Sequence, residues 1–222
     1  LGLYASNKTS SMKMPWIILI LIFPIMGVGL YLMIGLNGGT RKMRIRYKDI
    51  DNIILPLLPE NQETLGRLNE KNPKAGNIAY YIKKNANYPV YQNTDVTYYS
   101  EAVKGLEAQL EELSKAESFI FMEYHAIEDA QAWYMIQKVL EERVQAGGEV
   151  RIFYDDMGSI GFINTDFIKK LENVGIQCRV FNPFMPGLNV FLNNRDHRKI
   201  TVIDGKIGFT GGYNLANEYF NF

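Results

Sequence analysis

Apolar residues in the C-terminal part of the chain form two patterns that alternate along the sequence. Three stretches repeat them every three or four positions, which predicts amphipathic helices over 99–116, 129–147 and 165–175. Short apolar runs, typical of buried strands, lie at 118–124, 150–154 and 177–182. Strands and helices that alternate with such short connections predict an α/β fold, with a mixed, mainly parallel sheet and helices on both faces.

A different pattern marks the N-terminal part. Residues 14–40 contain no charged side chain, and the apolar segment 15–36 has 22 residues. At about 1.5 Å per residue, a helix of this length spans ~33 Å, which is enough to cross a bilayer. Trp16 and Tyr31 lie toward its ends, where interfacial aromatic residues are common. The segment therefore predicts a transmembrane helix over 15–36.

Charge and composition divide the chain into four parts. Five Lys and Arg residues follow the apolar segment between 41 and 48, and only two lysines precede it, so the positive-inside rule places the C-terminal side in the cytoplasm. The predicted parts are a polar loop, the transmembrane helix, a basic juxtamembrane segment with a linker, and a globular domain: 1–14, 15–36, 37–92 and 93–222.

The overall composition excludes some classes of protein. The formal net charge is zero, so nothing in the whole-chain charge indicates a nucleic-acid partner. The single cysteine, Cys178, excludes an internal disulfide framework and fits a reducing compartment. No set of His, Cys and Asp residues has the spacing of metal ligands, so no metal site is predicted.

The clearest chemistry lies in a predicted β-hairpin at 195–214. Residues 199–203 are rich in β-branched side chains, and Asp204 and Gly205 form a turn dipeptide. His197 and Lys199 are two positions apart, which on a strand places them on one face. An imidazole can attack phosphorus and form a covalent intermediate, while an ammonium stabilises the charge that builds on the phosphoryl oxygens. The hairpin therefore predicts phosphoryl chemistry.

The hairpin carries a longer pattern that resembles the phospholipase D superfamily. His197, Lys199 and Asp204 have the spacing His-x-Lys-x4-Asp, and Gly-Gly-x-Asn follows at 211–214. Within that superfamily the chain is most similar to bacterial cardiolipin synthases. This similarity rests on the amino-acid sequence of the hairpin and on three further segments. They are Asn-Thr-Asp-Val-Thr-Tyr-Tyr, Phe-Met-Glu-Tyr and Tyr-Asp-Asp-Met-Gly-Ser at 93–99, 121–124 and 154–159.

The resemblance implies a reaction and its residues. The reaction would be phosphatidyl transfer between two phosphatidylglycerol molecules, giving cardiolipin and glycerol through a phosphatidyl-histidine intermediate, without a metal or cofactor. His197, Lys199 and Asp204 would be catalytic, with Asp204 shaping the turn and the hydrogen bonds around the site. Lys199, Gly212 and Asn214 would bind phosphate. The partners would be phosphatidylglycerol and membrane lipid, at a bacterial-type inner membrane, with no nucleic acid.

One departure from the family pattern is the number of motifs. The family carries two such motifs per chain, and this chain has one, with eight residues after Asn214. Residues 93–222 are therefore expected to be the first half of a phospholipase D-like catalytic domain that is truncated at its C-terminus. The second half would come from the missing C-terminal part of the same chain, and the fragment alone would be inactive.

Two other functions remain open from the sequence. A phospholipase D-type hydrolase, acting on lipid or on nucleic acid, would use the same intermediate and transfer it to water. The membrane segment and the neutral charge disfavour the nuclease. A chain with half a site is alternatively a membrane-tethered fragment without activity.

Further candidates follow the predicted strands, because ligands of open α/β sheets bind beyond the carboxyl ends of strands. Glu123 and Tyr124 end the first strand, and Asp155 and Asp156 follow the second, so all four are possible site-lining residues. His125 is the second histidine and an alternative general acid, although no lysine follows it at the motif spacing. The apolar segment 182–194 either covers core or dips into lipid.

Overall fold

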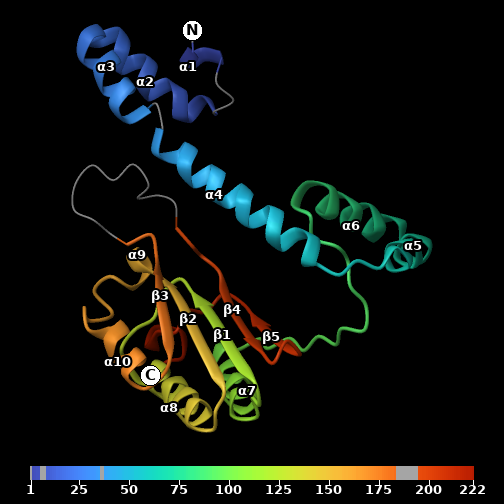
Figure 1. The fold of residues 1–222 in the computed structure, drawn as a ribbon. Helices are drawn as coiled ribbons and strands as arrows, with labels where there is room; N and C mark the ends of the chain where they lie inside the picture. The colour runs from blue at the N-terminus through green and yellow to red at the C-terminus, as the bar shows by residue number, and fades with distance from the viewer. Residues whose placement is uncertain (1, 6–8, 36–37, 184–194) are drawn as a thin grey trace. The chain divides into compact units, whose positions relative to one another are not determined.

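The computed structural model describes residues 2–5, 9–35, 38–183 and 195–222. The chain forms two compact units, residues 1–96 and 97–222, and each is described by itself (Figure 1). Of the apolar segment 182–194, predicted to cover core or to dip into lipid, residues 184–194 lie outside the described residues.

The predicted transmembrane helix is broken in the structure. Its residues form α2 (Ser10–Ile22), α3 (Pro24–Leu30) and a π-helix (Tyr31–Gly35), after a short α1 (Gly2–Ala5). The break falls at Phe23, whose φ is −128°, because Pro24 lacks an N–H and excludes helical geometry from the residue before it. The prediction of one helix over 15–36 is therefore wrong. Among the described residues, no helix combines the length and the apolar character needed to cross a membrane.

Three further helices complete the first unit: α4 (Gly38–Ile54), α5 (Gln62–Lys71) and α6 (Pro73–Ala86). A 3-10 turn (Leu55–Leu57) follows α4. The side chains of Asn61 and Asn72 cap α5 and α6 by accepting backbone N–H groups of Glu63 and Ala75. Asn87, with φ of 61°, ends α6 in the left-handed conformation that often closes a helix.

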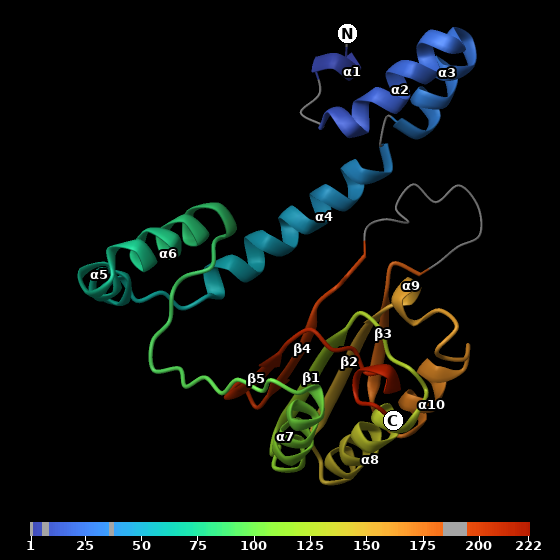
Figure 2. The same ribbon diagram turned by 180° about the vertical axis from the view of Figure 1, so that it is seen from behind.

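The second unit is built on a five-stranded sheet, shown from opposite sides in Figures 1 and 2. Its strands are β1 (Phe119–Tyr124), β2 (Glu149–Asp155), β3 (Gln177–Phe181), β4 (Lys199–Ile203) and β5 (Ile207–Thr210), in the order β3-β2-β1-β4-β5. The pairs β1–β2 and β2–β3 are parallel, whereas β1–β4 and β4–β5 are antiparallel. The sheet is mixed, as predicted, but its pairs divide evenly between the two directions.

Helices cover one face of this sheet. They are α7 (Ala102–Ser114), α8 (Gln131–Gln145) and α10 (Phe167–Asn173), and they lie on the same side of the strands in Figures 1 and 2. Residues of β1 alternate between this buried face and the opposite one, as the period of a strand requires. Ile120 and Met122 face the helices and pack with Trp133, Ile136 and Leu140 of α8 in the core.

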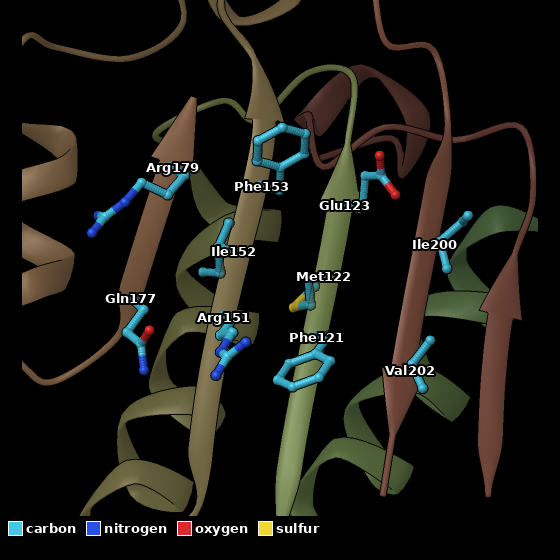
Figure 3. A pocket seen from close by; sticks show the side chains of 10 residues that line it. All are labelled: Phe121, Met122, Glu123, Arg151, Ile152, Phe153, Gln177, Arg179, Ile200 and Val202. Carbon is cyan, nitrogen blue, oxygen red and sulfur yellow. The ribbon is translucent and has the colours of Figure 1, made fainter. Parts of the chain in front are cut away.

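The opposite face of the sheet is open within the described part of this unit. A shallow hollow of about 440 Å³ lies over β1 to β4, and Figure 3 shows its lining side chains. Phe121, Phe153 and Val202 supply apolar surface, while Glu123 and Arg151 supply charge. Helices on both faces were predicted, and for the described residues of 97–222 this is wrong. Periodicity identifies a buried face but does not say which element covers the other.

Two helix starts also differ from the prediction. The helix expected to begin at Asp129 is capped at Ala130, and the Asn217 side chain accepts the N–H of Ala132 in its first turn. The helix expected to start at residue 164 or 165 begins at Phe167. Near the C-terminal end of the unit, Asn217–Tyr219 form a 3-10 turn. Caps that come from distant residues cannot be read from local sequence.

Candidate active site

Two residues of the motif, His197 and Lys199, lie at the edge of the sheet where the parallel strands end. Lys199, the first residue of β4, pairs with Tyr124, the last residue of β1, and Tyr124 pairs with Tyr154 near the end of β2. His197 precedes β4 and therefore extends beyond this edge. This is the edge at which ligands bind open α/β sheets, and the candidates that follow the predicted strands lie at the same edge.

His197 and Lys199 differ in exposure. The Lys199 side chain is buried, and its Nζ donates a hydrogen bond to the carbonyl oxygen of His197 at 2.9 Å. The His197 ring is exposed. Burial lowers the pKa of Lys199. The positive charge of Lys199, followed by burial and by His125, lowers the pKa of His197, although Asp155 and Asp196 oppose this effect. The lowered pKa of His197 favours the neutral imidazole, which carries a lone pair.

Asp155 fixes the chain segment that leads to His197. Its carboxylate is fully buried at the end of β2. One oxygen accepts the backbone N–H of Asp196 at 2.8 Å, and the other accepts Arg195 Nη1 at 3.1 Å and the N–H of Gly158 at 3.1 Å. Asp155 was predicted to line the site. It lies there as an anchor whose oxygens already bind three donors of the protein.

A second carboxylate group lies beside this segment. Glu123 contacts Arg198 at 2.6 Å, and Arg198 also binds Asp196 through its Nε at 3.0 Å. Burial, and then the neighbouring Asp196, raise the pKa of Glu123 to about 7. Burial acts in the same direction on Asp196, but hydrogen bonds from Glu123 and Arg198 outweigh it and hold its pKa at about 2. Glu123 therefore lies next to the site, on the open face of the sheet in Figure 3.

The structure brings a second imidazole to His197. The ring centroids of His125 and His197 are 4.7 Å apart, with the planes tilted by 56°. His125 Nδ1 lies 2.7 Å from the carbonyl oxygen of Asp196, so this nitrogen carries the proton of the neutral ring. The sequence pattern indicates His125 only weakly, because no lysine follows it at the motif spacing. Its position directly after a strand that ends at the site was the signal that favoured it.

Asp204 lies at the other end of β4, away from His197. Its two oxygens accept the backbone N–H groups of Glu117, Ser118 and Phe119, each at 2.8 Å, and these bonds lower its pKa. A strand of five residues at about 3.3 Å each separates the two ends by roughly 16 Å. A catalytic role for Asp204 stays a prediction, and in the structure its carboxylate binds backbone N–H groups away from His197. It holds the start of β1 against the turn between β4 and β5.

The residues of the Gly-Gly-x-Asn segment have separate roles. Asn214 is buried; its Oδ1 accepts the N–H of Ala126 at 3.2 Å, and its Nδ2 donates to the Tyr219 hydroxyl at 2.9 Å. This amide thus fixes the loop that follows β1. Gly212 is exposed, with open space where a Cβ would stand. Phosphate binding by Asn214 and Gly212 stays a prediction.

The remaining two candidates have different surroundings. Tyr124 points into the core, where Gln109 Nε2 donates to its hydroxyl at 3.0 Å and to Thr201 Oγ1 at 2.8 Å, so it supports the site from below. Asp156 begins the short α9 (Asp156–Ser159) and is half-buried beside Asp155. In the ranges that the structure describes, no three His, Cys, Asp or Glu side chains converge as metal ligands.

Comparison with known proteins gives this site a family. A family model described as "Cardiolipin synthase, PLD-like domain" matches residues 110–222, and one described as "Phospholipase_D-nuclease N-terminal" matches residues 3–35. A Streptococcus mutans protein of uncharacterised function is 39% identical over 93% of this chain and 45% of its own length. A cardiolipin synthase of Oceanobacillus iheyensis is 31% identical over 98% of this chain and 46% of its own length.

Solved structures show a weaker likeness. Nuc of Salmonella typhimurium, a phospholipase D family member, has a TM-score of 0.41 and 22% identity, covering 54% of this chain and 70% of that one. The chain spans about half the length of the curated relatives that it matches. The first family model covers half of the chain and includes all five strands and the motif residues His197, Lys199 and Asp204. The chain therefore belongs to the family of phospholipase D-like domains described for cardiolipin synthase.

Proposed function

We propose that this chain supplies one half of a phosphatidyltransferase site, which joins two phosphatidylglycerol molecules into cardiolipin and releases glycerol. The observation that carries the proposal is the exposed imidazole of His197 beside the buried ammonium of Lys199, in a chain of the cardiolipin synthase family. A curated relative named cardiolipin synthase, with 31% identity over nearly the whole chain, supports the choice of substrate.

In the proposed first step, His197 is the nucleophile. Its lowered pKa favours the neutral ring, whose lone pair attacks the phosphorus of one phosphatidylglycerol. The bond from phosphorus to the glycerol oxygen breaks, and that oxygen takes a proton from a general acid. We assign the general acid to a histidine of a second catalytic half. A phosphatidyl group remains on His197 through a P–N bond.

In the proposed second step, the hydroxyl of another phosphatidylglycerol attacks the same phosphorus. Its proton passes to the group that acted as acid, and the P–N bond breaks to give cardiolipin. Lys199 has three N–H donors, of which one goes to the His197 carbonyl. We propose that another stabilises the phosphoryl oxygens as negative charge builds on them. Transfer to water instead of a lipid hydroxyl would make the protein a phospholipase D-type hydrolase.

The proposed substrates place the protein at a membrane. Both are lipids, and the first unit presents apolar side chains such as Leu21, Ile22 and Ile25 on its surface. A cytoplasmic side for residues 97–222 stays a prediction from the basic residues that follow the apolar segment.

Lipid analysis tests the proposal. The protein, as its own gene encodes it, is produced in bacteria that lack cardiolipin, and the extracted lipids are measured by mass spectrometry. We expect cardiolipin with the wild-type protein and with Lys170→Ala, an exposed change on α10, but none with His197→Gln. Phosphatidic acid without cardiolipin would instead show the hydrolase. Equal cardiolipin from His197→Gln and the wild type would contradict both.

A further inference from the structure

The two histidines of this chain form a pair that the family motif does not describe. His197 belongs to the motif, whereas His125 follows β1, yet their ring centroids are only 4.7 Å apart. The hydrogen bond from His125 Nδ1 to the Asp196 carbonyl ties the second ring to the residue directly before His197. Because His125 and His197 belong to separate segments, other residues must hold the two segments in place for their rings to stay in contact.

The surrounding structure holds the backbone after β1 from several sides. The N–H of Ala126 binds Asn214 Oδ1 at 3.2 Å, and the N–H of Ile127 binds the buried Ser159 hydroxyl at 3.1 Å. Gly158 lies directly against His125. A Cβ on Gly158 would overlap the His125 carbonyl oxygen and lie 2.8 Å from both Cε1 and Nε2 of the ring. The motif residue Asn214 and Gly158, a glycine of α9, thus both serve to place His125.

We propose that His125 is a positioning residue for His197: the two imidazoles form a coupled pair in which the adjacent His125 ring disfavours a proton on the His197 ring, so that His197 stays neutral and nucleophilic. The two rings lie where the end of β1, the end of β2 and the start of β4 come together. The effect of the pair on catalysis rests on the proposed function, but the coupling itself does not.

The charged groups around the two histidines do not cancel the unfavourable effect on a protonated His197 ring. The titratable and charged groups of the neighbouring elements are Glu123, Asp155, Asp156, Arg195, Asp196, Arg198 and Lys199. Arg195 binds Asp155, and Arg198 binds both Asp196 and Glu123, so these three carboxylates already have a cationic partner. Lys199 adds a positive charge with its Nζ at the His197 carbonyl. Like charges at close range disfavour one another, and the pKa of His197 is lowered accordingly, first by Lys199 and also by His125.

Proton NMR tests the coupling without any need for activity. The chain has two histidines, so the ring signals of the full chain in detergent micelles can be assigned with the single variant His197→Gln. The pKa of His197 is then measured in the wild type and in His125→Asn. Asparagine keeps an N–H donor near the position of Nδ1 and removes the titrating ring. We expect the pKa of His197 to rise by about half a unit or more in this variant.

A second variant tests whether the hydrogen bond to the Asp196 carbonyl is needed for the shift. His125→Phe keeps a ring but loses both the charge and the donor, and the coupling predicts that it also raises the pKa of His197. In the enzyme assay, both variants should move the acidic limb of the kcat/KM profile to higher pH and retain most of the activity above it. An unchanged His197 pKa in a folded His125→Asn protein would overturn the proposal. A missing cardiolipin product, with the pKa shift present, would count against the proposed function alone.

Discussion

The Asp155 carboxylate on β2 and the backbone N–H of Asp196 are joined by a buried hydrogen bond of 2.8 Å. The two residues are separated by 41 positions in the chain, and the bond fixes the residue directly before His197. One buried carboxylate therefore connects the parallel part of the sheet to the motif. The geometry of the site depends on this long-range contact as well as on the motif itself.

Replacement of Asp155 should damage both stability and the site. Asp155→Ala leaves the Arg195 guanidinium, the N–H of Asp196 and the N–H of Gly158 without their common acceptor. We expect a loss of about 2–4 kcal/mol in the free energy of unfolding, since unpaired buried donors are costly. Urea unfolding followed by circular dichroism measures it. The matched control is Asp156→Ala at the next position, which is half-buried, and an equal loss there would contradict the anchoring role.

Replacement of Lys199 should affect turnover more than folding. Lys199→Met keeps a long side chain in the buried position but removes the ammonium. We expect cardiolipin formation to fall by about 10²-fold or more, because the developing phosphoryl charge loses its partner. Lys199→Arg should recover little, since the planar guanidinium differs in shape from the compact ammonium. The assay is cardiolipin formation per folded molecule, and near-normal turnover of Lys199→Met would exclude the proposed role.

Asp204 should matter for folding and not for chemistry. Asp204→Asn removes the charge that receives three backbone N–H groups, and asparagine tolerates the φ of 51° at this position. We expect a lower urea midpoint at pH 7 and an unchanged kcat for the protein that remains folded. The pKa of Asp204 is lowered in the folded state, so its contribution is present above the unfolded pKa and is lost as the pH falls through the folded pKa. The variants should therefore converge in stability at acidic pH. A large drop in kcat would instead support a catalytic role for Asp204.

Glu123 should give the stability of the protein a pH dependence of opposite sign. Its pKa is about 7 in the folded protein, above the value of about 4.3 for an unfolded chain. The folded state then binds more protons between these two values, so stability decreases as the pH rises from about 4.3 to 7. Glu123→Gln should flatten the decrease, measured as the urea midpoint at a series of pH values. Gln177→Glu, on the same open face of the sheet, is a control that should not flatten it. A wild-type curve that rises through this window would contradict the assignment.

The sequence by itself was sufficient for the existence of the strands β1 to β5 and of the helices α7, α8 and α10 in the second unit, and for the residues of the motif. Periodic apolar positions such as Trp133, Ile136 and Leu140 form a helix face because 3.6 residues complete a turn, and this relation is local. The spacing from His197 to Lys199 is also local, and it led to the phospholipase D-like family that the family model shows. In the first unit, local apolar character misled the prediction, because Pro24 ends a helix however hydrophobic its neighbours are.

Only the tertiary structure decided which distant residues meet at His197. The His125 ring reaches His197, and the Asp155 carboxylate reaches Asp196, because β1 pairs with both β2 and β4. The same pairing carries Asp204 to the opposite end of β4, although it is only seven positions from His197 in the sequence. Strand order and register are set by the burial of whole faces and not by any single residue. The sequence motif therefore identifies the residues, while the strand order and register of the sheet determine which of these residues lie in one site.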